Sequence, residues 1–140
     1  MASGKTTAGR HLAESAGYHF IDLDEYIVAR TGRSIAEIFA SDGESAFRAI
    51  ESQYLREILT GHLADGLVLA LGGGTILGPA NAALIKEHSI CIWLDTPLAT
   101  IKERLASDHS ERPLLKIHDI DALFAQRRPL YSAAADIVVR

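Results

Sequence analysis

The residues with the clearest chemical meaning stand at the start of the chain, where residues 2–7 read ASGKTT. This segment is the second half of the pattern G-x-x-x-x-G-K-[ST], whose backbone N–H groups and helix N-terminus bind phosphate. Gly4 lets the backbone come close to a ligand, Lys5 supplies positive charge for the β- and γ-phosphates, and the Thr6 hydroxyl can ligate Mg²⁺. The plainer interpretation is a surface Gly-Lys-Thr at a helix start, and half a motif leaves both open.

A pair of carboxylates follows a short apolar run. Asp22 and Asp24 stand at positions i and i+2, so an extended segment would point both to the same side. One carboxylate of such a pair can hold the water shell of Mg²⁺, and the other can accept a proton from a hydroxyl group. The alternative is that one of them caps the helix that contains Tyr26 and Ile27.

Arginines and a glycine turn complete the set. Arg48 lies on a long amphipathic segment, the glycines at 72–74 follow an apolar run, and Arg112 lies in a polar loop. Arg127 and Arg128 stand together near the last helix. An arginine fork can hold a carboxylate, and a loop arginine can stabilise charge on a transferred phosphate. Each has a plainer alternative: a solvated helix edge, a flexible turn or a solvated loop charge.

The elements that must position these residues follow from apolar periodicity and capping signals. We expect helices at 5–16, 34–40, 44–63, 79–87, from Pro97 onward and at 119–134. We expect strands at 19–23, 67–71, 89–94 and 136–139, and a loop at 109–118. Ser34 and Glu37 have the spacing of a capping box. Alternation of strands with helices predicts a parallel sheet covered by helices on both faces.

Composition narrows the class of protein. The chain has 140 residues with 48% apolar and 23% charged, which is typical of one globular domain spanning residues 1–140. A formal net charge of −4 gives no sign of a nucleic-acid surface. Cys91 is the single cysteine, so no intrachain disulfide is possible and a cytoplasmic location is expected. No apolar run is long enough to cross a membrane, and no signal peptide is evident at the start.

Taken together, these segments resemble the shikimate kinase family, in the nucleoside-monophosphate-kinase-like group of P-loop folds. The resemblance rests on GKTT, DLDEYI, TGRSIAEIF, GESAFRAIE, LALGGG, ERPLL and RRPLY, which occur in this order and at family spacing over nearly the whole chain. It implies a three-layer α/β/α parallel sheet of P-loop kinase type. It also implies transfer of the γ-phosphoryl group of ATP to the 3-hydroxyl of shikimate, a step of aromatic amino acid biosynthesis, by a monomer.

The resemblance assigns a role to each matching residue. The catalytic residues are expected to be Lys5, Asp24 and Arg112. ATP is expected to contact Ser3, Gly4, Lys5, Thr6, Thr7, Arg104 and Arg112, with Arg104 packed on adenine. Shikimate is expected to contact Asp24, Arg48, Gly72, Gly73, Gly74 and Arg127, and Mg²⁺ to be held by Thr6 and Asp22. Counting back from Pro-Leu-Tyr selects Arg127 and not Arg128, and residues 107–118 form the expected lid.

The sequence departs from the family pattern at both ends. Family members begin with a strand and the first half of the phosphate loop, and they continue past the last strand into a final helix. We therefore expect a sheet without its N-terminal central strand, no C-terminal helix, and a chain that is a fragment or starts at an internal methionine, with weak ATP binding and marginal stability. Two alternatives stay open: another small-metabolite kinase such as gluconate kinase, and an inactive shikimate-kinase-like binding protein.

Overall fold

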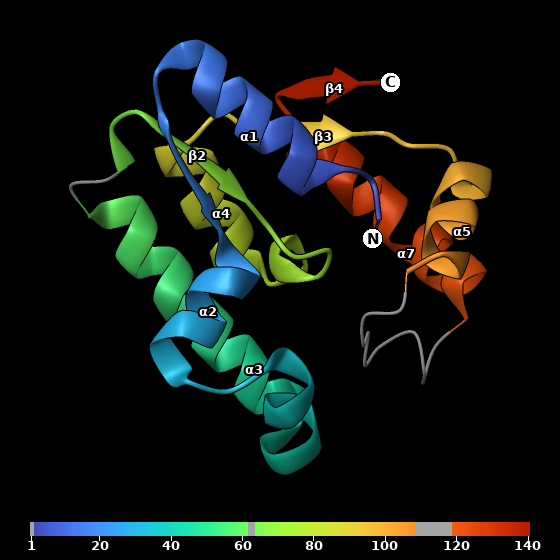
Figure 1. The fold of residues 1–140 in the computed structure, drawn as a ribbon, viewed down its shortest axis with the longest axis horizontal. Helices are drawn as coiled ribbons and strands as arrows, with labels where there is room; N and C mark the ends of the chain where they lie inside the picture. The colour runs from blue at the N-terminus through green and yellow to red at the C-terminus, as the bar shows by residue number, and fades with distance from the viewer. Residues whose placement is uncertain (1, 62–63, 109–118) are drawn as a thin grey trace.

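Strands and helices alternate along the chain, as the apolar periodicity predicts. The computed structural model describes residues 2–61, 64–108 and 119–140 (Figure 1). Its elements are α1 (Lys5–Ala16), β1 (His19–Asp22), α2 (Leu23–Thr31), α3 (Ile35–Thr60), β2 (Leu67–Ala70), the 3₁₀ turn η2 (Thr75–Leu77), α4 (Pro79–His88), β3 (Ile92–Leu94), α5 (Leu98–Ala106), α7 (Ile120–Ala134) and β4 (Ile137–Val139). The loop expected at 109–118 lies outside the described residues.

The four described strands form two parallel ladders. β1 pairs with β2, with His19 opposite Leu67, and β3 pairs with β4, with Ile92 opposite Ile137. Within the described residues, no ladder joins β2 to β3. Figure 1 shows α1 on one side of the strands and α4 and α7 on the other. The predicted α/β class with parallel strands and flanking helices is confirmed, although the strands are shorter than predicted and form two ladders.

Side-chain caps explain where several helices begin. The Ser34 hydroxyl accepts the Glu37 N–H at 3.1 Å, and the Glu37 carboxylate accepts the Ser34 N–H at 3.0 Å. The predicted capping box is therefore confirmed. Asp119 caps α7 by accepting the N–H of Asp121 at 2.9 Å. Each cap satisfies backbone donors that the first helical turn would otherwise leave unpaired.

The two helices expected at 34–40 and 44–63 are one element in the structure. α3 runs from Ile35 to Thr60 and contains a single non-helical residue, Gly43, with φ 86° and ψ 171°. Glycine adopts this conformation without the penalty that a Cβ atom brings. The glycine that suggested a boundary therefore produces a break within one helical element. The α3 segment after this break carries Arg48.

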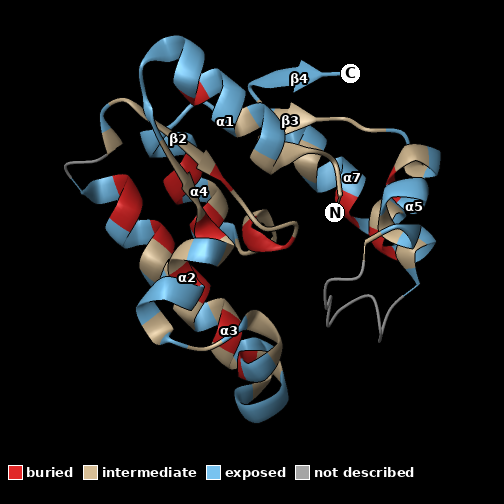
Figure 2. Ribbon diagram, viewed as in Figure 1, coloured by how far each residue is buried: buried red, intermediate tan, exposed pale blue. Residues whose placement is uncertain are grey.

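The hydrophobic core belongs mainly to the first ladder and its helices. Its buried members come from α2, α3 and α4: Leu23, Ile27, Ile38, Phe47, Leu55, Ile58, Leu59, Leu84 and Ile85. Figure 2 shows most of the buried residues along these helices, with others on α1 and α7, whereas β4 is exposed along its length. The second ladder thus has much less buried apolar surface to stabilise it.

No helix in the described parts of the chain is long and apolar enough to cross a membrane.

Candidate active site

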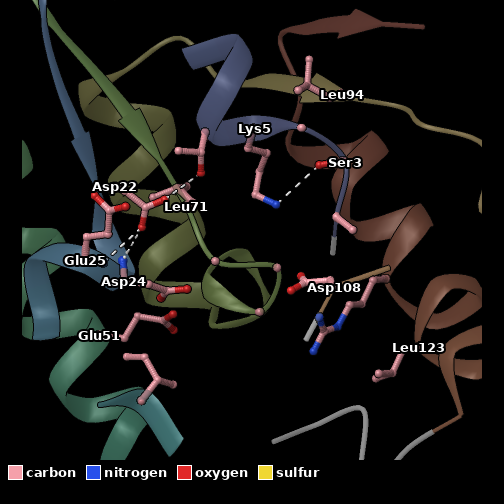
Figure 3. Close-up of a pocket in the computed structure, with 18 of the residues that line it drawn as sticks. Ser3, Lys5, Asp22, Asp24, Glu25, Glu51, Leu71, Leu94, Asp108 and Leu123 are labelled. Carbon is pink, nitrogen blue, oxygen red and sulfur yellow. Dashed lines mark hydrogen bonds between the residues drawn. The ribbon is translucent and has the colours of Figure 1, made fainter. Parts of the chain in front are cut away.

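A cavity of about 1160 Å³ opens where β1 and β2 end. Figure 3 shows Lys5 reaching into it from above, with Asp22, Asp24 and Glu51 along one wall and Asp108 across from them. Its lining includes the predicted residues Ser3, Gly4, Lys5, Thr6, Thr7, Asp22, Asp24, Arg48, Gly72, Gly73, Gly74, Arg104 and Arg127. Arg112, the remaining predicted site residue, lies outside the described residues. Residues spread from position 3 to position 127 therefore meet at one place.

The phosphate loop opens directly into this cavity. Gly4 is the N-cap of α1 with φ 90°, a left-handed conformation that favours glycine. It leaves the first N–H groups of a twelve-residue helix facing the cavity without a side-chain cap. The Nζ atom of Lys5 lies 3.5 Å from the Ser3 hydroxyl, and the lysine side chain extends across the space (Figure 3). A helix N-terminus beside a lysine suits an anionic phosphate group.

Asp22 caps a helix, which is one of the two roles that the sequence left open, and its role toward Mg²⁺ stays a prediction. Its Oδ1 atom caps α2 by accepting the N–H groups of Asp24 at 3.0 Å and Glu25 at 3.2 Å. Its Oδ2 atom accepts a hydrogen bond from the Thr6 hydroxyl at 3.0 Å. The assumption that an extended backbone aligns the two carboxylates is wrong, because Asp24 lies in the first turn of α2. The two acids share the cavity because Asp24 follows the cap into that turn.

Asp24 has the most perturbed carboxyl group at this site. Burial raises its pKa to about 6, and the negative charges of Asp22 and Glu51 add to the rise. The positive charges of Lys5 and Arg48 oppose it. The Asp24 carboxyl therefore lines the cavity close to two acidic and two cationic side chains.

Arg48 is held in place rather than exposed on a solvated helix edge. It donates to Glu51 at 2.9 Å, and Glu51 in turn accepts the Thr75 hydroxyl at 2.8 Å. The Glu51 side chain is only 1% exposed, so this ion pair is desolvated on the glutamate side. A Cβ atom on Gly74 would lie 2.2 Å from the Arg48 guanidinium. The absence of a side chain at Gly74 therefore lets the guanidinium lie against the backbone, and a side chain there would displace it.

The two adjacent arginines of α7 have different surroundings. Arg127 is 5% exposed and lines the cavity, and its Nε atom has no hydrogen-bond partner among the described residues. Arg128 pairs with Asp95 at 2.8 Å and lies over the Trp93 ring at 5.6 Å. A buried guanidinium N–H without a partner is costly, so it is suited to an anion that enters the cavity.

Arg104 contacts the phosphate loop itself. Its guanidinium donates to the Ala2 carbonyl at 3.1 Å, and its Nη1 atom would lie 3.5 Å from a Cβ atom on Gly4. The Thr96 hydroxyl donates to the Ser3 carbonyl at 3.2 Å from the same side. These contacts place Arg104 beside the phosphate loop, and its packing on adenine stays a prediction.

Sequence reasoning did not select several residues that the structure places at the site. Glu51 stands three residues after Arg48 on the same helical face, a spacing that could have identified it. Phe39 packs against Phe47 with ring centroids 4.9 Å apart, and both line the cavity. Tyr131 donates its hydroxyl hydrogen to the Gly73 carbonyl. Tyr131 belongs to the RRPLY segment, but nothing in the sequence identifies its partner, which lies 58 residues away.

The protein offers few ligands of its own to a metal ion. Across the residues that the structure describes, no group of three His, Cys, Asp or Glu side chains is arranged to hold a metal. Thr6 and Asp22 provide adjacent oxygen donors beside the phosphate loop. This donor set fits Mg²⁺, which keeps several waters and takes its remaining ligands from substrate phosphates.

The α/β fold, the glycine-lysine-threonine loop at a helix N-terminus and the facing acids and arginines define a P-loop kinase of small molecules. The shikimate kinase family model matches residues 1–140. The chain is 48% identical to the shikimate kinase of Parasynechococcus marenigrum strain WH8102 over 143 residues, covering 99% of this chain and 72% of that protein. The chain belongs to the shikimate kinase family.

Other relatives agree. The shikimate kinase of Salinibacter ruber is 42% identical over 146 residues, covering 96% of this chain and 70% of that protein. The solved structure of the Acinetobacter baumannii shikimate kinase in complex with shikimate matches with a TM-score of 0.92 at 38% identity, covering 100% of this chain and 78% of that one. Family membership and the fold are thus supported by sequence and by structure.

Proposed function

We propose that this chain transfers the γ-phosphoryl group of ATP to the 3-hydroxyl of shikimate. The observation that carries the proposal is a single cavity in which a phosphate loop faces a carboxylate and two arginines, Arg48 and Arg127. A structural neighbour that binds shikimate, matched over the full length of the chain, supports the choice of acceptor.

The nucleotide end of the cavity is formed by the N-terminal loop. The N–H groups at the start of α1 and the Lys5 ammonium would bind the β- and γ-phosphates, with Ser3, Gly4 and Thr7 around them. Arg104 approaches the same loop from α5 and would contact the nucleotide. These groups supply positive charge where the leaving diphosphate gains negative charge.

The opposite end would hold the ring acid. Arg48 and Arg127 present guanidinium groups that can hold its carboxylate. The buried Nε atom of Arg127 has no partner among the described residues and would gain one from this carboxylate. The Asp24 carboxylate would accept hydrogen bonds from ring hydroxyls. The glycines at 72–74 let the ring lie close to the backbone, because no side chain intervenes.

Mg²⁺ would be held by the Thr6 hydroxyl and, directly or through water, by Asp22. When bound, it would neutralise charge on the β- and γ-phosphates. The Thr6–Asp22 hydrogen bond of 3.0 Å already keeps these two oxygen donors together. The protein's part is therefore to bring its own oxygens to the nucleotide phosphates.

The reaction is an exchange of one phosphorus–oxygen bond for another. The 3-hydroxyl oxygen of shikimate bonds to the γ-phosphorus, and the bond from that phosphorus to the β–γ bridging oxygen breaks, so ADP leaves. The hydroxyl proton passes to the Asp24 carboxylate and then to solvent. Arg112 from the lid expected at 107–118 would stabilise the transferred group. We further propose that the chain acts as a single domain, as a monomer and in the cytoplasm.

The proposal is tested by following ADP release with ATP and Mg²⁺ in the presence of shikimate or gluconate. We expect ADP release that depends on shikimate and does not respond to gluconate. Lys5→Met should reduce the rate by about 100-fold or more, because it removes phosphate-directed charge. Lys86→Met is the matched control, since this lysine lies exposed on α4 outside the cavity. A chain that binds ATP but responds equally to both acceptors, or to neither, would contradict the proposal.

A further inference from the structure

The two arginines proposed to hold the carboxylate, Arg48 and Arg127, reside in different parts of the fold. Arg48 is on α3, which packs with the first ladder through α2, whereas Arg127 is on α7, which packs on the second ladder through the contact of Tyr131 with Trp93. Because no strand pairing joins the ladders within the described residues, the distance between the arginines depends on other contacts. The main one is the packing of α7 against the turn that follows β2.

A hydrogen bond from Tyr131 lies at this junction. The Tyr131 hydroxyl donates to the carbonyl of Gly73, the middle residue of the glycine turn. Its ring packs against Trp93 with the centroids 6.1 Å apart. Tyr131 thus connects a strand of the second ladder to the turn that follows a strand of the first.

The glycine turn, which Tyr131 contacts, also lies against site residues that belong to the first ladder. A Cβ atom on Gly74 would overlap the Arg48 guanidinium, and one on Gly72 would lie 3.3 Å from Asp24. On its far side the turn is held by Thr75, which donates to the buried Glu51. A shift of the turn by a few tenths of an ångström would therefore move the groups around Arg48.

On α7 itself, Arg127 and Tyr131 stand four residues apart and so lie on the same face of the helix. Between them is Pro129, which has no N–H to give to the helix and leaves the Ala125 carbonyl without its usual donor. The helix therefore has one backbone hydrogen bond fewer at this point. The contact of Tyr131 with Gly73 helps to hold the helical segment that carries Arg127.

From these contacts we infer that Tyr131 is a positioning residue, whose hydroxyl fixes α7 against the glycine turn and so sets the spacing of Arg48 and Arg127 for one carboxylate. The identity of the carboxylate rests on the proposed function. The fixing of α7 against the glycine turn does not depend on it. Burial raises the pKa of Tyr131, and the charge of Arg127, a hydrogen bond with the Arg127 side chain and the charge of Arg48 oppose the rise. The hydroxyl therefore stays protonated at neutral pH and available as a donor.

The test compares Tyr131→Phe with Tyr18→Phe. Both substitutions remove one hydroxyl and keep the ring, but Tyr18 is 52% exposed and outside the cavity. For Tyr131→Phe we expect the KM for shikimate to rise about 3- to 10-fold, with the KM for ATP and kcat changed less than about twofold. Tyr18→Phe should leave all three unchanged. An unchanged KM for shikimate in Tyr131→Phe, or equal rises for both substrates, would overturn the inference.

Hydrogen–deuterium exchange of the turn makes the test independent of turnover. The N–H groups of Thr75 and Leu77 are bonded to the carbonyls of Gly72 and Gly74, so their protection reports on the order of the turn. We expect exchange in peptides covering 71–78 to be several-fold faster in Tyr131→Phe than in Tyr18→Phe or the wild type. Equal exchange would reject the anchoring role even if the wild type proved inactive. Faster exchange with no shikimate turnover in the wild type would instead reject the proposed function alone.

Discussion

At the scale of single residues, Arg127 and Arg128 offer a matched pair. Arg127→Lys keeps the charge but loses the planar fork, so we expect the KM for shikimate to rise on the order of 10- to 100-fold. Arg128→Lys alters an ion pair whose arginine is 51% exposed, and it should change KM less than about twofold. Steady-state kinetics of both variants provide the measurement. Similar effects of the two substitutions would show that the cavity does not distinguish the arginines.

The raised pKa of Asp24 predicts a pH-dependent cost to stability in the protein without metal and nucleotide. Folding raises this pKa from 3.8 to about 6, so folding favours the protonated carboxyl. We therefore compare the wild-type free energy of unfolding with that of Asp24→Asn. The wild-type value should be highest relative to the variant below about pH 4 and should fall as the pH rises to about 6. Above that pH, Asp24→Asn should be the more stable by about 3 kcal/mol. Urea unfolding of both proteins across this range measures the difference.

Asp42 provides a control of opposite sign. A hydrogen bond from Arg33 at 2.8 Å lowers the pKa of this exposed carboxyl. Its contribution to stability is therefore present at neutral pH and lost as pH falls through the lowered value. Asp42→Asn should make the protein less stable at neutral pH and have no effect in strong acid. If both aspartate substitutions shifted stability in the same direction with pH, burial would not explain the Asp24 value.

A side-chain contact could be predicted from the sequence when the residue's partner is near in the sequence. The Ser34–Glu37 cap could be predicted because both partners lie within one helical turn. The residues assigned by resemblance line one cavity, apart from the undescribed Arg112. The Tyr131 contact could not be predicted, because its partner Gly73 is 58 residues away and a backbone carbonyl gives no signal in sequence.

At the scale of elements, the break in α3 predicts an unusual sensitivity at Gly43. With φ 86° and ψ 171°, this residue occupies a region that side-chain-bearing residues avoid, and a Cβ atom there would meet nothing within 4 Å. Gly43→Ala should therefore lower the free energy of unfolding by about 1–3 kcal/mol through backbone strain alone. Urea unfolding measures this loss.

Gly78→Ala is the matched control. Gly78 has φ −73° and ψ 123°, which any residue adopts, and its Cβ atom would make ordinary contacts at 3.5 Å or more. We expect its substitution to change stability by less than about 0.5 kcal/mol. An equal loss in both variants would mean that glycine content, and not the conformation of Gly43, controls this part of the chain.

Most elements could be predicted from periodicity and caps, and the errors have identifiable causes. The helix at Lys5–Ala16 has the predicted bounds, since Gly4 and Gly17 flank it. Asp24 was expected on an extended segment but is helical, because the Asp22 side chain caps α2 one residue earlier than the apolar run suggested. The strands are shorter than their apolar runs because pairing, which depends on a neighbour, determines where a strand ends.

At the scale of the whole molecule, the uneven core predicts uneven protection. The buried cluster belongs to α2, α3 and α4, whereas Ile137, Val138 and Val139 of β4 are each more than 40% exposed. Amide hydrogen exchange should therefore be slower in α3 than in β4, on the order of tenfold or more. Mass spectrometry of peptides from the two regions measures the ratio. Equal protection would show that the ladders open as one cooperative unit.

The separation of the two ladders also predicts how the enzyme should lose activity as temperature rises. α1, with the phosphate loop at its start, packs on the first ladder, and Arg127 is carried by a helix that packs on the second. A slight loosening between them would leave each helix intact while moving Arg127 away from Arg48 and the phosphate loop. Turnover should therefore be lost at a lower temperature than helical circular dichroism, so that a heated sample becomes inactive while its spectrum still looks native.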